Sequence, residues 1–201
     1  MTRDIEEACV KAKTWAIDAA LPLWSSAGFD AASGRFQERL DLAGRPIPEI
    51  PRRLMVQCRQ IAVYALADEL GWCHGRDIVR NAVEHLERSY FQADGAPGWI
   101  FSIDADGSPA DVCRDSYAHA FVLLALGWAY RTLGTLRLID LADQTLAFID
   151  RQLASPLHGG LIERAPPSWL TSAPEHPDAL FGSPSVSRRG DGATTVPGAG
   201  G

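Results

Sequence analysis

Two short segments of the chain share the pattern D-x-x-G-x-P, and the second lies 63 positions after the first (41 to 104). The two copies are Asp41, Gly44 and Pro46, then Asp104, Gly107 and Pro109. Aspartate bonds to its own backbone in a turn, and glycine supplies the positive φ that the turn requires. Each copy therefore predicts a short β-hairpin, at 33–48 and at 97–111.

Helical periodicity dominates the rest of the chain. Apolar residues recur every three or four positions, and they predict helices over 3–24, 51–72, 76–90, 113–133 and 136–153. With a third hairpin expected at 158–164, the chain repeats a unit of two helices and one hairpin. Helix pairs of this kind must stack on neighbouring pairs to bury their apolar faces. An open solenoid and a closed ring both allow this; the short hairpins favour the ring, which has a central cleft.

The bulk composition excludes several classes of function. The net charge is −6 and basic residues cluster only in twos and threes, which argues against a nucleic-acid partner. No apolar run reaches the length of a membrane span, and the charged N-terminus lacks the apolar core of a signal peptide, so we expect a cytoplasmic protein. The sequence has no C-x-x-C pair and no metal-binding or nucleotide-binding motif, so we predict no metal and no cofactor.

Arg59 lies in the middle of a largely apolar helical segment. The helix face that carries it is polar in its first turns and apolar further on, as expected for a helix whose N-terminal end lies at the rim of a cleft. A guanidinium group offers five donors in a fixed fork, which suits hydroxyl or carbonyl oxygens of a ligand. The same pattern also fits a structural arginine that pairs with a carboxylate or reaches water.

Asp115 and His119 are four positions apart and so share one helix face. A carboxylate beside a neutral imidazole would orient the ring and raise its pKa, which suits proton transfer. The alternative is an aspartate that caps the helix and a core histidine that bonds to a backbone group. Three aromatic residues could stack on a ligand, although such residues are more often core: Trp99, Tyr64 and Tyr117.

Several segments, in order, resemble the N-acylglucosamine 2-epimerase family, which includes cellobiose 2-epimerases and mannose–fructose type isomerases. The resemblance covers residues 14–165 and implies an all-α fold, a partial (α/α)6 barrel with short β-hairpins, incomplete because only about two and a half units are present. It is carried by GRFQERLDLAGRP, RRLMVQCRQIAVYALADELGW, GWIFSIDADGSPAD, RDSYAHAFVLLALGWAYRTLG and SPLHGGLIE.

The resemblance also implies a reaction and a site. It implies proton transfer at the carbon next to a sugar carbonyl, with histidines as acid and base and with no metal. Arg59 matches the family arginine that holds substrate oxygens, and His119 matches a cleft position that is histidine in the isomerase-like branch. We therefore predict His119 as catalytic, with Arg59, Asp115 and Trp99 binding the substrate. The expected partner is a small sugar that is mannose-, glucosamine- or cellobiose-like, and a homodimer is a further expectation.

One departure from the family concerns its principal catalytic histidines, which lie in the second half of the barrel. Where the first should follow the HGG hairpin, this chain reads APEHPDALFGSPS. We therefore expect residues 1–166 to be the N-terminal part of the barrel and 167–201 to be a disordered or frame-shifted tail.

The sequence thus predicts a sugar epimerase or isomerase in a truncated, inactive form. One alternative is a non-catalytic half-barrel that binds a ligand or associates with partner chains. The other is an (α/α)-barrel glycoside hydrolase, which needs two facing carboxylates.

Overall fold

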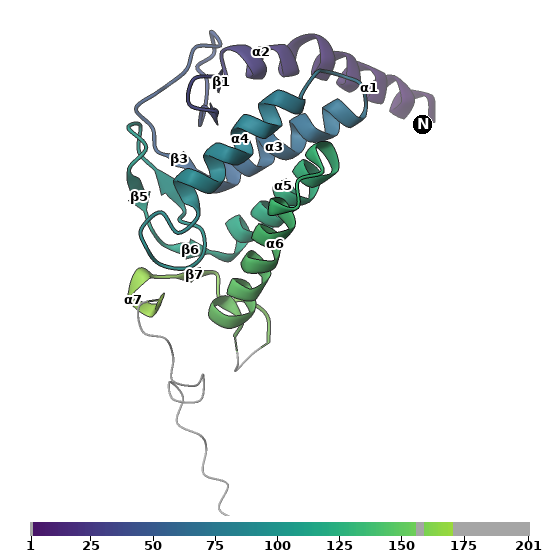
Figure 1. Cartoon of the computed structure of the whole chain (residues 1–201). Coiled ribbons are helices and arrows are strands. Elements are labelled where there is room, and N and C mark those ends of the chain that lie inside the picture. The colour runs from purple at the N-terminus through teal and green to yellow at the C-terminus, as the bar shows by residue number, and fades with distance from the viewer. Residues whose placement is uncertain (1, 156–158, 171–201) are drawn as a thin grey trace, which may run out of the picture.

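The computed structural model describes residues 2–155 and 159–170, and its regular structure is mostly helical (Figure 1). Two π-helical segments, η1 (Ala16–Ala20) and η2 (Ile149–Leu153), join α1 to α2 and extend α6. The five predicted helices are all present, and the first is built from α1, η1 and α2. The α-helices are α1 (Thr2–Trp15), α2 (Leu21–Ser26), α3 (Leu54–Glu69), α4 (Arg76–Tyr90), α5 (Ser116–Leu133), α6 (Arg137–Phe148) and α7 (Pro167–Leu170).

Short antiparallel strands gather at one end of the helices (Figure 1). They form three small sheets: β1 (Phe29–Asp30) with β2 (Arg35–Phe36); β3 (Arg52–Arg53) with β4 (Ser102–Ile103) and β5 (Pro109–Asp111); and β6 (Arg114–Asp115) with β7 (Arg164–Ala165).

The two D-x-x-G-x-P turns have the same geometry. Gly44 N–H donates to the Asp41 carbonyl over 2.9 Å, and Gly107 N–H donates to the Asp104 carbonyl over 3.0 Å. Both glycines have positive φ, +77° and +91°. The predicted turns are therefore confirmed, and the 63-residue spacing marks a structural repeat.

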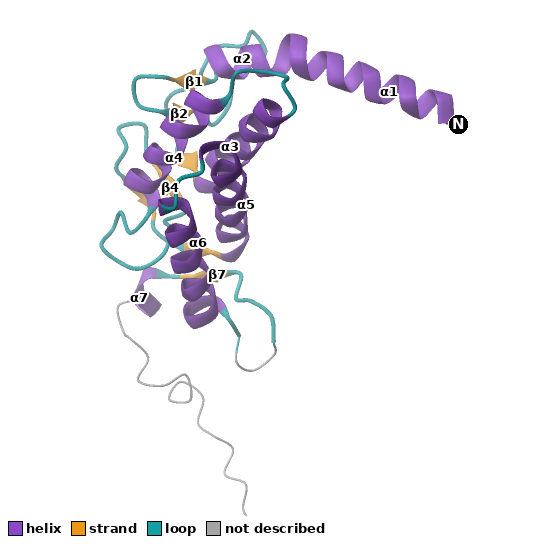
Figure 2. Ribbon diagram, turned by 45° about the vertical axis from the view of Figure 1, so that its right-hand side comes forward, coloured by secondary structure: helices purple, strands orange, loops and turns teal. Residues whose placement is uncertain are grey.

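Helices α3 and α5 are equivalent members of successive repeats and run parallel (Figure 2). They touch near both ends: Arg59 contacts Tyr117 close to their N-termini, and Arg131 pairs with Glu69 close to their C-termini. Helix α4 runs antiparallel beside α3. Its C-terminal end lies at the N-terminal end of α3, where the Tyr90 hydroxyl donates to a backbone carbonyl just before α3. The stack is thus α3 and α5 side by side, with α4 packed on α3 and α6 packed on α5.

The main core fills the space between α3, α4 and α5 and reaches under the hairpins. A smaller apolar cluster joins the end of α6 to α7 and is made of Phe148, Ile149, Leu153, Ala165 and Leu170. Helix α7 lies within the segment expected to be a tail, and Leu170 is buried there. Residues 171–201 of that segment lie outside the described residues.

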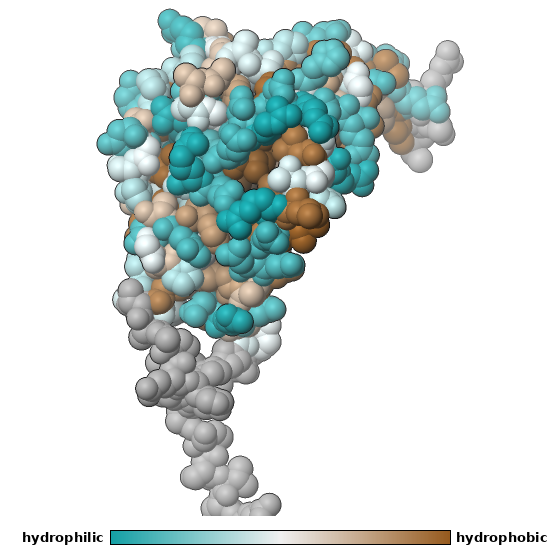
Figure 3. Space-filling model, viewed as in Figure 1, coloured by the Kyte–Doolittle hydropathy of each residue, from teal (hydrophilic) through white to brown (hydrophobic). Residues whose placement is uncertain are grey.

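Apolar side chains also reach the surface on the outer edge of the stack. Figure 3 shows them among hydrophilic neighbours over α5 and α6. The exposed apolar residues of α6 and the turn before it are Leu136, Ile139 and Leu146. Helix-pair stacks cover such faces with the next pair. In the part of the chain that is described, no helix has the length and apolar character needed to cross a membrane.

Candidate functional site

Arg59 projects from the second turn of α3 onto the face that α3 and α5 leave open. Its Nη2 donates to the hydroxyl of Tyr117, which lies in the first turn of α5, over 2.9 Å. Its guanidinium carbon lies 4.4 Å from the ring centroid of Phe121. Cation–π contact and one hydrogen bond hold the group, while its other donors remain available to a ligand. Arg59 therefore has a defined direction without being paired to a carboxylate in the described structure.

The open face changes character along the helices. The tyrosine beside the arginine is 53% exposed, and further along the exposed residues are Val63, Leu66 and Leu124. The polar residues lie at the hairpin end and the apolar ones lie away from it. This is the gradient predicted for a helix that lines a cleft with its first turns at the rim.

His119 does not reach this face. Its side chain is fully buried, its Nδ1 lies 2.7 Å from the Asp115 carbonyl, and its Nε2 accepts from Trp99 N–H over 3.2 Å. The ring also stacks on Phe148, with centroids 5.0 Å apart. Nδ1 carries the proton, since a carbonyl can only accept, so both nitrogens are engaged by the backbone. This geometry favours the core histidine over the predicted proton carrier.

Burial lowers the pKa of His119 to about 4, against the smaller opposing effect of its bond to the Asp115 carbonyl. The ring is therefore neutral near pH 7, which suits its one-donor, one-acceptor arrangement. A group that transfers protons at a substrate carbon must touch that substrate, and in this structure His119 touches the hairpin instead.

Gln57 of α3 occupies the position equivalent to His119 of α5, and its contacts show why that position is polar. It lies four residues after Arg53, the N-cap of α3, as His119 lies four residues after the N-cap of α5. Its side chain exchanges two hydrogen bonds of 2.9 Å with the backbone N–H and carbonyl of Phe36. Phe36 and Trp99 are themselves 63 positions apart (36 to 99), the spacing of the repeat. Gln57 and His119 thus make the same tie between α3 or α5, the inner helices of the two repeats, and the hairpin before it.

The other two predicted binding residues also have structural partners. Asp115 is the N-cap of α5, and its Oδ1 accepts from Ala118 N–H over 2.8 Å. Trp99 is fully buried, and its indole N–H donates to the Thr145 hydroxyl over 2.9 Å. Of the four predicted site residues, the structure places only Arg59 on the open face. Because the Asp115 carboxylate caps a helix, the glycoside hydrolase alternative is not favoured.

Tyr117 and Phe121 complete the site and were not among the predicted site residues. Tyr117 is one of the three aromatic candidates, and the other two, Trp99 and Tyr64, belong to the core. The Tyr64 side chain is buried, its hydroxyl donates to the Leu21 carbonyl, and burial raises its pKa to about 12. Phe121 lies 62 positions after Arg59 (59 to 121), the separation that also relates Gln57 to His119, so the spacing between the equivalent helices could have indicated it. Within the described ranges, no group of three histidine, cysteine or acidic side chains is arranged to hold a metal ion.

These features define a class: a stack of helix pairs, hairpins at one end, and an open inner face with one held guanidinium. The model of the N-acylglucosamine 2-epimerase (GlcNAc 2-epimerase) family matches residues 34–176. The chain belongs to that family.

Individual relatives agree with this assignment. Mannose-6-phosphate isomerase of Rhizobium meliloti (strain 1021) is 39% identical over 112 residues, which are 55% of this chain and 28% of that protein. D-mannose isomerase of Thermobifida fusca is 28% identical over 135 residues, 67% of this chain and 33% of that protein. Cellobiose 2-epimerase from Spirochaeta thermophila DSM 6192 superposes with a TM-score of 0.75 at 21% identity, covering 83% of this chain and 41% of that one.

Two facts follow from these comparisons. The fold is part of an (α/α)6 barrel with short strands, as predicted. The chain also spans well under half of the length of each of these relatives.

Proposed function

We propose that this chain forms one side of a sugar site in an epimerase or isomerase. The reaction is removal of a proton from C2 of an open-chain sugar and its return at C2 or C1. The substrate class is a mannose-, glucosamine- or cellobiose-like sugar. The family, and the isomerase and epimerase names of the relatives, support this reaction class. Location in the cytoplasm is part of the proposal.

The observation that carries the proposal is the pair of Arg59 and Tyr117 on the open face. Proton removal next to a carbonyl leaves negative charge on the carbonyl oxygen, and a fixed cation is worth most where that charge develops. Arg59 supplies the charge and the donors, while Phe121 beneath it and the Tyr117 hydroxyl beside it limit its rotation. A side chain that is already oriented loses less entropy when substrate binds.

His119 has a different role in this proposal. It positions α5 by tying the helix to the Trp99 backbone, and so it sets where Tyr117 stands one half-turn earlier. The proton carriers are then groups outside this face. The resemblance assigns them to histidines in the second half of the barrel, so turnover requires those helices.

The test is deuterium exchange at C2, followed by NMR. The purified chain, and a version extended to the length of its relatives, are incubated in D₂O with mannose, N-acetylmannosamine or cellobiose. We expect label at C2 and isomerised product with the extended version only. Cleavage of a glycosidic bond without label would contradict the proposed reaction. Robust turnover by the 201-residue chain would contradict the proposed need for the second half.

A further inference from the structure

Arg52 and Arg114 hold equivalent places in the two repeats. Each is the first residue of a two-residue strand, β3 or β6, and each stands two residues before an inner helix. Both side chains are buried, with 1% and 0% exposure. A buried guanidinium is strongly destabilising unless its charge and its donors are matched. The two arginines therefore face the same physical requirement.

Arg114 meets this requirement within the chain. Its Nη1 and Nη2 donate to the two carboxylate oxygens of Asp94, over 2.8 and 2.7 Å. Its nitrogens also donate to the carbonyls of Pro97, Val112 and Ala96. A two-point carboxylate pair of this kind is the strongest match that a guanidinium finds in a protein.

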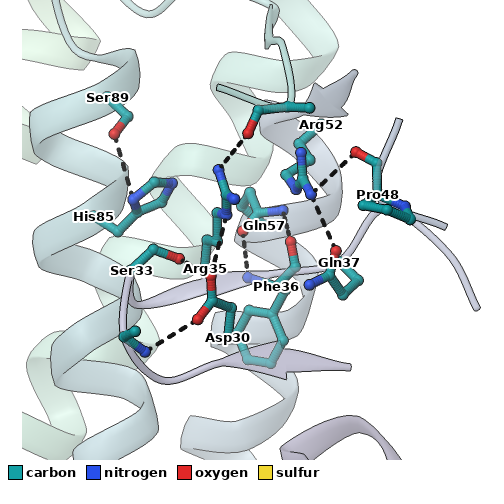
Figure 4. Close-up of polar contacts among 12 residues, drawn as sticks. Asp30, Ser33, Arg35, Phe36, Gln37, Pro48, Arg52, Gln57, His85 and Ser89 are labelled. Atoms are coloured by element: carbon teal, nitrogen blue, oxygen red, sulfur yellow. Dashed lines mark hydrogen bonds and ion pairs between the residues drawn. The ribbon is translucent and has the colours of Figure 1, made fainter. Parts of the chain in front are cut away.

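Arg52 lacks the equivalent partner. Its Nη2 reaches Gln37 Oε1 over 3.1 Å and the Pro48 carbonyl over 3.4 Å, as Figure 4 shows. Its Nε and Nη1 are buried without a hydrogen-bond partner among the described residues. No carboxylate of that part of the chain forms an ion pair with it, since nearby Glu38 is taken by Arg53 at 2.6 Å.

The sequence gives the reason for this difference. Phe91 pairs with Trp99 across the turn just before the second D-x-x-G-x-P hairpin, and Phe29 pairs with Phe36 across the turn just before the first. Asp94 is the third residue after Phe91, whereas the third residue after Phe29 is an alanine. The first repeat thus has no carboxylate at the position from which Asp94 pairs with Arg114 in the second repeat.

More unmatched polar atoms lie around Arg52. Figure 4 shows the Arg35 guanidinium between Arg52 and the ring of His85. Arg35 Nε and His85 Nε2 are both buried without a hydrogen-bond partner in the described structure, and Arg35 Nε is 3.6 Å from Asp30 Oδ2. Burial lowers the pKa of Arg52, and the positive charge of Arg35 lowers it further. Asp30 is the carboxylate that pairs with Arg35, and its charge also acts on Arg52.

We propose that Arg52 and Arg35 form a binding site for a compact anion. The anion occupies the position beside Arg52 that the Asp94 carboxylate occupies beside Arg114. It accepts hydrogen bonds from Arg52 and from Arg35 Nε. Its negative charge balances the positive charge that Asp30 leaves unmatched. The ligand class is a small carboxylate, an inorganic oxyanion or a halide. The site lies where β2 packs against α4, whereas Arg59 contacts α5, and so it is separate from the proposed sugar site.

Thermal unfolding of the purified chain tests this site. Sodium acetate, sodium phosphate and sodium chloride are titrated separately, with the sodium salt of HEPES, whose anion is bulky, holding the ionic strength constant. We expect at least one of the three to raise Tm in a saturable way, by roughly 3–6 °C at about ten times its Kd. Saturation by acetate or phosphate identifies an oxyanion site, and saturation by chloride alone identifies a halide site.

Two variants and one control decide the assignment. Arg52→Met keeps the length of the side chain without its charge and should lose the saturable shift. Arg35→Gln, at a partly exposed position, should weaken it at least tenfold in Kd and serves if Arg52→Met does not fold. Arg80→Gln removes an exposed arginine of α4 that pairs with Asp77, and it should keep the full shift. A shift that is absent from the wild type, or that persists unchanged in Arg52→Met or in Arg35→Gln, would overturn the proposal.

Discussion

Arg59 and His119 are polar residues in the opening turns of two equivalent helices, yet their environments are opposite. Arg59 is exposed and held over an aromatic ring, whereas His119 is buried with both nitrogens on backbone groups. The difference is one of phase. Arg59 is six residues after its N-cap and His119 is four, and two positions turn a side chain by about 200° around the helix axis. That rotation takes a side chain from the hairpin to the open face.

A polar residue on an inner helix therefore has two distinct uses in this repeat. At four residues after the N-cap it ties the helix to the preceding hairpin, as Gln57 and His119 do. At six residues after the N-cap it faces the space that the ring would enclose.

Replacing Arg59 by alanine should have the largest effect, and on kinetics alone. In a version extended to the full barrel, we expect kcat/KM to fall by roughly 10²–10³-fold, because a fixed donor is lost where charge develops. The Tm should change little, since the side chain is exposed. Steady-state kinetics and a melting curve measure both, with Arg80→Ala as the control for loss of a surface arginine. Near-normal kinetics would remove Arg59 from the site.

Replacing His119 by alanine should act on stability instead. It leaves a cavity beside Phe148 and a buried Trp99 N–H without its acceptor, so we expect unfolding to become easier by about 2–4 kcal/mol in urea. His119→Gln should recover part of the loss, since glutamine makes the equivalent tie in the first repeat. An alanine variant of unchanged stability that has lost turnover would restore His119 as a proton carrier.

Acid should weaken the fold through the same histidine. The folded pKa is about 4 and the unfolded value is 6.5, so the unfolded chain binds more protons between these pH values. Stability should therefore fall as the pH drops from 6.5, by about 1.5 kcal/mol at pH 5 from His119 alone. Urea unfolding at pH 7, 6 and 5 measures this. The free energy of unfolding should depend less steeply on pH in His119→Gln. An equal pH dependence in that variant would place the titrating group elsewhere. His85 is one such group, since burial also lowers its pKa to about 4.

The smallest effect should come from Tyr117→Phe. This change removes the hydroxyl that receives the Arg59 hydrogen bond and keeps the ring beside Phe121. We expect kcat/KM of the extended version to fall by about tenfold, since one hydrogen bond that orients Arg59 is lost while the ring contacts remain. Arg59→Ala and Tyr117→Phe combined should cost no more than Arg59→Ala alone. Additive losses would mean that the two side chains act independently.

The helices and turns followed from local signals, because apolar periodicity and glycine turns act over a few residues. The helix face on which each polar residue lies could not be predicted as readily. Arg59 and His119 both interrupt apolar helices, and a sequence pattern does not fix the phase of a helix relative to the hairpin before it. Gln57 and His119 are 62 positions apart, one fewer than Phe36 and Trp99, so an alignment of the two repeats that allows a single gap pairs His119 with Gln57 and indicates a tie to the backbone. The charge imbalance at Arg52 needed the structure, because the missing carboxylate is visible only beside its equivalent, Asp94.

The two helix–hairpin ties also bear on how the chain folds. Phe36 to Gln57 spans 21 residues and Trp99 to His119 spans 20, so each tie closes a short loop within one repeat. Short loops close quickly and at low entropic cost, and contacts between adjacent repeats add to them in order. The first hairpin and α3 can therefore be joined before α5 has left the ribosome. Assembly in this order gives each inner helix its orientation before its neighbour arrives, so the open face is set from the N-terminus onward as synthesis proceeds.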